Sequence, residues 1–138
     1  MDAKDIDYTK TVTQTQPDAL GKLKDALREN KWGVVSDIDM RATLKEKIGA
    51  DVESYNILDV CNPGLANQAL KLNKKAGLVM PCKLVVYSEA GSTVVSLYLP
   101  TRMFPREIGK YQELQKLAEE AETSLKKVVD AIASTVPV

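Results

Sequence analysis

The sequence contains no histidine, and this absence excludes several classes of functional site. Catalysis by a Ser-His-Asp or Cys-His set, zinc binding by histidine pairs and haem binding by a histidine ligand all need an imidazole. Cysteine is also scarce, because Cys61 and Cys82 are the only two, and one pair cannot supply the full thiolate set of a structural zinc or iron–sulfur site. The sequence therefore predicts neither a catalytic residue set nor a metal site within one chain.

Charge of one sign and long apolar runs are also missing. The 19 basic and 19 acidic residues give a net charge of zero, so no overall field attracts the chain to nucleic acid or to an anionic membrane. The sequence contains no run of roughly 18 apolar residues, which is the length that a membrane-spanning helix needs. The polar residues 1–5 do not resemble the start of a secretory signal. We therefore expect a soluble, cytoplasmic protein with no nucleic-acid or membrane partner.

Length and hydrophobic content fit one domain over residues 1–138, because 44% hydrophobic residues can supply one core. The periodicity predicts the order β-α-β-α-β-α-β-β-α. Strands are expected at 8–15, 33–38, 54–61, 82–88 and 93–99, and helices at 17–30, 40–48, 63–76 and about 107–134. The strands are half polar, whereas a parallel sheet covered on both faces needs apolar strands. We therefore predict an α+β two-layer sandwich with a mostly antiparallel five-stranded sheet and helices mainly on one face.

The last two strands form a predicted hairpin whose register follows from its turn. A two-residue Ala-Gly turn at 90–91 pairs Glu89 with Ser92 and Leu84 with Leu97, which places apolar residues together on the core side. The opposite face is less polar than a solvated surface usually is, and it carries Lys83, Val85, Tyr87, Val94, Ser96 and Tyr98. This face predicts a dimer interface or the wall of a ligand site; the alternative is a sheet face partly covered by a loop or by the long helix.

Both cysteines lie where one element passes into the next. Cys61 ends a strand and precedes the helix start at 62–64, where free amides and the helix dipole lower a thiol's pKa and attract anions. Cys82 begins the fourth strand, so the two thiols would meet if these strand ends adjoin. The binding candidates from both ends and from the hairpin face are Cys61, Asn62, Pro63, Gly64, Met80, Pro81, Cys82, Tyr87 and Tyr98.

A structural role for the cysteines is the alternative. Cysteine is often buried as a small apolar residue, and Cys82 opposite Leu99 fits this role. Strand alternation also places Cys61 on the face away from the core, whereas Cys82 faces inward, which argues against a shared site.

Three segments resemble a known family: residues 55–63 (YNILDVCNP), 77–82 (GLVMPC) and 84–87 (LVVY). Over roughly residues 30–105 the chain resembles the uncharacterised bacterial and archaeal family named domain of unknown function 302. The resemblance implies a small α+β fold with the outline of the TATA-binding-protein-like sandwich, and a homodimer. It implies no established activity, and neither the resemblance nor the residues identify a cofactor.

These observations predict a non-catalytic module that binds a small molecule or a partner and acts as a homodimer. The alternative function is that of a thiol-based redox or sulfur-handling protein that uses Cys61 and Cys82.

Overall fold

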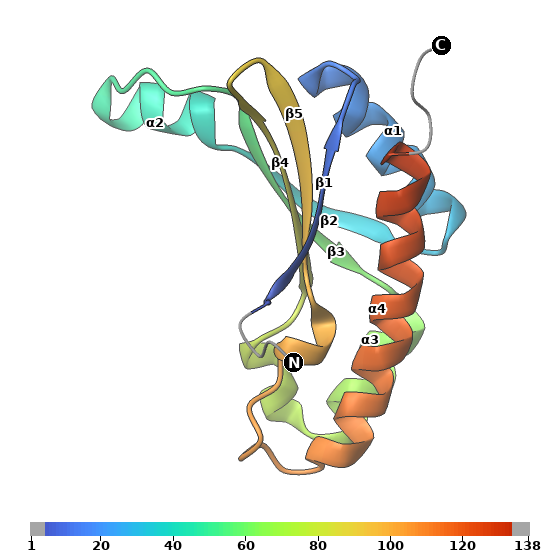
Figure 1. Ribbon diagram of the computed structural model, residues 1–138. Helices are drawn as coiled ribbons and strands as arrows, with labels where there is room; N and C mark the ends of the chain where they lie inside the picture. The colour runs from blue at the N-terminus through green and yellow to red at the C-terminus, as the bar shows by residue number, and fades with distance from the viewer. Residues whose placement is uncertain (1–4, 134–138) are drawn as a thin grey trace.

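The computed structural model describes residues 5–133, and within this range five strands form one antiparallel sheet (Figure 1). Its spatial order is β1-β5-β4-β3-β2. The strands are β1 (Asp7–Val12), β2 (Gly33–Asp39), β3 (Tyr55–Cys61), β4 (Cys82–Glu89) and β5 (Ser92–Tyr98).

The helices lie mostly on one side of this sheet. They are α1 (Gln16–Glu29), α2 (Met40–Ile48), α3 (Pro63–Leu72) and α4 (Tyr111–Ala133), with the short 3-10 helices η1 (Lys74–Leu78) and η2 (Pro100–Arg102). In Figure 1, α1, α3 and α4 cover one face, whereas α2 projects away from the other side. This arrangement confirms the predicted two-layer α+β sandwich and its element order. No helix within residues 5–133 is both long and apolar enough to cross a membrane.

The main core lies between the covered sheet face and the helices α1 and α4. Leu58, Leu84 and Leu97 are paired side by side across β3, β4 and β5, and all three are fully buried. Helix α4 buries a seam of residues that are three or four positions apart, which consists of Leu114, Ala118, Ala121, Leu125, Val128 and Ile132. Val129 is also buried beside this seam, so the apolar side of α4 is wider than the seam of a free coiled coil. A side of this width packs across a sheet.

The hairpin register also agrees with the prediction. Ala90 and Gly91 both have positive φ values, 51° and 83°, as a two-residue turn between twisted strands requires. Glu89 pairs with Ser92 at the turn. The alternation that follows from this turn buries one hairpin face in the core.

Helix α3 is shorter than predicted. It ends at Leu72 rather than near Gly77, because Asn73 adopts an extended conformation with φ −160° and ψ 118°. The Asn73 side chain then accepts a hydrogen bond from the Lys75 amide at 2.9 Å and begins η1. A local side-chain bond therefore replaces the continuing helix.

Two further boundaries differ for local reasons. Strand β1 ends at Val12 rather than near residue 15, because Thr15 serves as the N-cap of α1 and accepts a hydrogen bond from the Asp18 amide. Helix α4 begins at Tyr111 rather than at 107, after Lys110 in the left-handed conformation with φ 67°. The predicted end of this helix at residue 134 lies outside the described residues.

Candidate functional site

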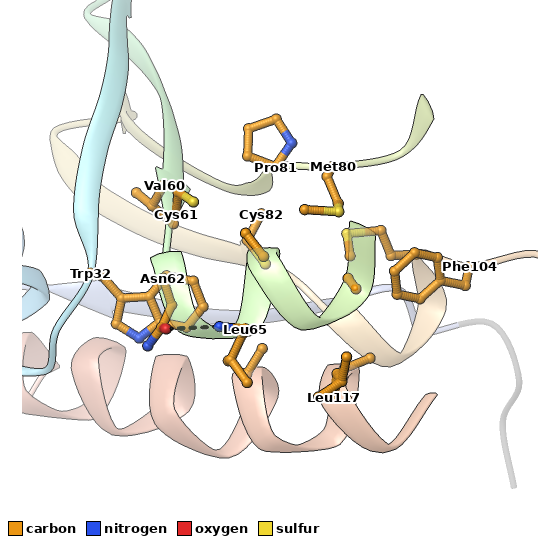
Figure 2. A pocket seen from close by; sticks show the side chains of 15 residues that line it. Trp32, Val60, Cys61, Asn62, Leu65, Met80, Pro81, Cys82, Phe104 and Leu117 are labelled. Carbon is orange, nitrogen blue, oxygen red and sulfur yellow. Dashed lines mark hydrogen bonds between the residues drawn. The ribbon is translucent and has the colours of Figure 1, made fainter. Parts of the chain in front are cut away.

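Most of the predicted binding residues line one small apolar cavity. Cys61, Asn62, Met80, Pro81 and Cys82 all contribute to its wall, at the corner where β3 passes into α3 and β4 begins (Figure 2). The cavity measures about 50 Å³ and is partly open to the surface. Strand ends that are 21 positions apart in sequence are therefore neighbours in the fold.

The start of α3 fixes one side of the cavity. Asn62 is the N-cap, and its Oδ1 atom accepts a hydrogen bond from the Leu65 amide at 3.1 Å (dashed line in Figure 2). Pro63 occupies the first helical position, where its missing amide hydrogen costs no hydrogen bond. Pro63 and Gly64 are exposed and do not line the cavity.

The two cysteines lie on adjacent antiparallel strands at the same end of the sheet. Cys82 is paired with Val60, the residue before Cys61. Both thiols are free and half-buried, and both line the cavity although strand alternation predicts opposite faces. The cavity sits where the strands end, so side chains from both sides of the sheet reach its wall.

Burial raises the pKa of the Cys82 thiol to about 12, and the neighbouring Cys61 acts in the same direction. The Cys82 sulfur is therefore protonated and uncharged at neutral pH. A thiol in this state is a poor nucleophile and a poor metal ligand.

Several wall residues come from segments that sequence reasoning did not assign to a site. Trp32 is 3% exposed and donates a hydrogen bond from Nε1 to Ser124 Oγ at 2.9 Å. Phe104 and Leu117 close the side nearest α4, and Figure 2 shows Leu117 extending from α4 toward α3. The buried seam of α4 was the one sequence feature that could have indicated these wall residues. Its position along the sheet, however, depends on contacts between residues that are distant in sequence.

None of the described residues that line the cavity carries a charged side chain. Two of its polar groups, Trp32 Nε1 and Asn62 Oδ1, are engaged in hydrogen bonds within the protein. Among residues 5–133, no group of three or more cysteine or carboxylate side chains could hold a metal ion. The arrangement can therefore surround an uncharged apolar group.

Stability is expected to fall at alkaline pH because of Cys82. An unburied cysteine has a pKa of 9.0, so above that pH the unfolded chain loses a proton that the folded chain keeps up to about pH 12. The Cys82 contribution to the free energy of unfolding is complete below pH 9 and falls by about 1.4 kcal/mol per pH unit above it. Urea unfolding at pH 8 and pH 10.5 should show a loss about 2 kcal/mol larger in the wild type than in Cys82→Ala.

Other alkaline titrations cancel in this comparison. A hydrogen bond to Asp130 raises the pKa of Tyr8, and burial raises the pKa of Tyr87, but both tyrosines are present in both proteins. Equal losses in the wild type and in Cys82→Ala would contradict a buried, protonated thiol.

The two predicted tyrosines lie on the open face of the sheet, away from the cavity. Tyr87 stacks on Tyr55 of the neighbouring strand, with ring centroids 5.2 Å apart and an interplanar angle of 8°. Tyr98 is 37% exposed and donates a hydrogen bond from its hydroxyl to the Arg102 carbonyl at 3.1 Å. The structure thus divides the predicted site into a cavity and a separate aromatic surface.

Comparison with known proteins relates the chain to a family and to a solved structure that are both described as uncharacterised. The family model described as domain of unknown function DUF302 matches residues 8–132 and so includes α4, beyond the region 30–105 that carried the resemblance. The fold is similar to the crystal structure of an uncharacterized conserved protein, DUF302, from Bacillus stearothermophilus, with a TM-score of 0.85 and 29% sequence identity. The similarity covers 92% of this chain and 98% of that chain. None of the curated proteins matches the sequence.

Proposed function

The chain belongs to the DUF302 family, and from this premise we propose that it is a non-catalytic module that binds a small, uncharged, apolar ligand and acts as a homodimer. The ligand site is the cavity between the β3–α3 junction and α4. The observation that supports this function is the wall of the cavity, which is almost wholly apolar and joins five separate parts of the chain.

The chemistry of the wall favours binding over catalysis. General acid–base catalysis needs a group that exchanges protons near neutral pH within reach of the substrate. Carboxylates and lysines are absent from the wall, and Cys82 keeps its proton to about pH 12. A charged ligand would lose its hydration without gaining a partner, so the ligand is uncharged.

The size of the cavity sets the size of the ligand. A dry engineered cavity of about 150 Å³ accepts benzene, and this cavity of about 50 Å³ is smaller. It therefore accommodates only a few non-hydrogen atoms as it stands. Met80 and Met103 line it with flexible, polarisable side chains that can change rotamer to admit a larger group.

Xenon is a suitable probe because it is small, apolar and uncharged. Dissolved xenon is expected to shift the NMR signals of the Met80 and Met103 methyl groups in a saturable manner, as occupation of one site requires. Ala118→Val, which adds two methyl groups to the wall, is expected to weaken these shifts at least tenfold at the same xenon pressure.

The matched control is Ala131→Val, the same change on an exposed position of α4. It should leave the xenon response at the wild-type level. A response that rises linearly without saturation, or that is equal in the wild type and Ala118→Val, would rule out a ligand site in this cavity.

A thiol-based redox or sulfur-handling function is the second candidate, and it is supported by two free sulfurs on one cavity wall. The raised pKa of Cys82 opposes it, because such chemistry needs a thiolate near neutral pH. The alkaline unfolding experiment distinguishes the two candidates. A Cys82 that ionises near neutral pH would produce no extra loss of stability between pH 8 and pH 10.5.

A further inference from the structure

Helix α2 is amphipathic and yet has no buried residue. Its apolar positions Met40, Leu44 and Ile48 are four residues apart and so share one side of the helix. Ile48 is 73% exposed. Asp39 caps the helix and Gly49 ends it in the left-handed conformation with φ 68°, so its boundaries are well defined. Met40 and Leu44 are half-buried and the Ile48 end is largely exposed, so the apolar side of α2 is incompletely covered by the residues that the structure describes.

A wide groove lies between α2 and the open face of the sheet. We call it the α2 groove; it has a volume of about 640 Å³ and includes Met40, Leu44, Val52, Tyr55, Ile57 and Tyr87 in its lining. Figure 1 shows α2 projecting beyond the sheet, so the helix is a ridge beside this hollow. The stacked pair of Tyr55 and Tyr87 forms a flat apolar surface there, and aromatic side chains of this kind are enriched in protein interfaces.

The charges on the two features are complementary. Helix α2 carries three basic residues, Arg41, Lys45 and Lys47, against one acidic residue, Glu46. The α2 groove has the acidic residues Glu53 and Glu89 in its lining. Lys45 already forms an ion pair with Asp51 of the same chain at 2.9 Å, so Arg41 and Lys47 supply the basic excess of the ridge. A ridge with a basic excess and a hollow with acidic residues are thus present on the same chain.

We infer that two copies of this chain pair through the α2 groove, each placing its α2 in or against the groove of the other. A two-fold axis makes such a contact self-complementary, because the same rotation brings the α2 helix of each copy against the α2 groove of the other. The apolar side of α2, including Ile48, is then covered, and the basic residues of each helix approach Glu53 and Glu89 of the second copy. The inference rests on the homodimer of the proposed function and is independent of the ligand in the cavity.

The placement differs from the dimer surface that the sequence suggested. The predicted surface was the hairpin face, which includes Val94. The Val94 side chain is only 6% exposed, so it is already covered within the chain. The α2 groove is lined instead by Tyr55 and Ile57 of β3 and by Met40 and Leu44 of α2. Tyr87 is the one predicted binding residue that belongs to the surface in both descriptions.

Sedimentation velocity of the full chain over a range of 1 to 200 µM tests this arrangement. The wild type is expected to be a dimer at the higher concentrations. Ile48→Asp places a carboxylate at the covered surface and is expected to raise the dimer Kd at least 100-fold. Lys47→Glu removes charge complementarity from an exposed position and is expected to raise it about tenfold.

Leu78→Asp is the matched control, because Leu78 is 82% exposed and lies on η1, outside the α2 groove. It should retain the wild-type Kd. Circular dichroism and thermal unfolding of each variant establish that it is folded, which is expected because α2 contributes no buried residue to the core.

The outcomes separate this inference from the rest of the proposal. A wild type that stays monomeric at 200 µM overturns both the inference and the homodimer. A wild-type dimer that Ile48→Asp and Lys47→Glu leave intact overturns the α2 groove as the interface and spares the homodimer. The xenon experiment measures ligand binding in either case.

Discussion

A chain that ends at Pro105 is expected to lose cooperative folding altogether. This truncation removes α4, whose large buried side chains are Leu114, Leu125, Val128, Val129 and Ile132. Burial of each such side chain contributes about 1.5 to 3 kcal/mol, so the helix accounts for roughly 10 kcal/mol of apolar burial. The total stability of a domain is of the same order, about 5 to 15 kcal/mol. Urea unfolding followed by circular dichroism should show no sigmoidal transition.

Point variants in the complete chain show whether the truncation acts by removing buried side chains or only by shortening the chain. Leu125→Asp buries a carboxylate in the seam and is expected to unfold the protein or to lower its free energy of unfolding by more than 4 kcal/mol, a loss typical of buried unpaired charge. Lys127→Asp changes an exposed position of α4 and should have an effect within about 0.5 kcal/mol. A truncated chain with a cooperative transition would show instead that α4 is an appended helix.

The local parts of the fold were predictable because short-range chemistry determines them. Asn62 and Pro63 mark the start of α3, and the Ala-Gly turn at 90–91 sets the hairpin register. Each of these signals determines the conformation of residues only a few positions away in the sequence. The same reasoning placed the end of α3 too late. The hydrogen bond from the Lys75 amide to the Asn73 side chain competes with the helix, and this bond is harder to predict from the sequence than a cap or a turn.

The candidate site was only partly predictable, since its walls come from distant segments. The pairing of Val60 with Cys82 places the two cysteines at one sheet end, and this follows from strand order once β3 and β4 are neighbours. The contributions of Trp32 and Leu117 depend on how α4 crosses the sheet, which no local pattern specifies. The spacing of Met40, Leu44 and Ile48 places them on one side of α2, but only the structure shows that this side is incompletely covered.

Leu84→Ala is expected to lower the free energy of unfolding by about 2 to 5 kcal/mol, the range for a leucine removed from a packed core. Leu84 is 0% exposed and lies in the middle of the sheet, paired with Leu58 on one side and Leu97 on the other. Removal of its side chain leaves a void that β-sheet neighbours on both sides cannot fill without breaking their own pairing. Urea unfolding should show a lower midpoint with an unchanged m-value.

Leu78→Ala removes the same atoms from a side chain that is 82% exposed. Its effect should stay within about 0.5 kcal/mol, because little apolar surface leaves water when that leucine folds. Both variants are compared at two protein concentrations, since pairing of two copies makes apparent stability depend on concentration. The difference between them then measures burial at the sheet centre, and similar losses at the two positions would contradict a core that lies between the covered sheet face and α4.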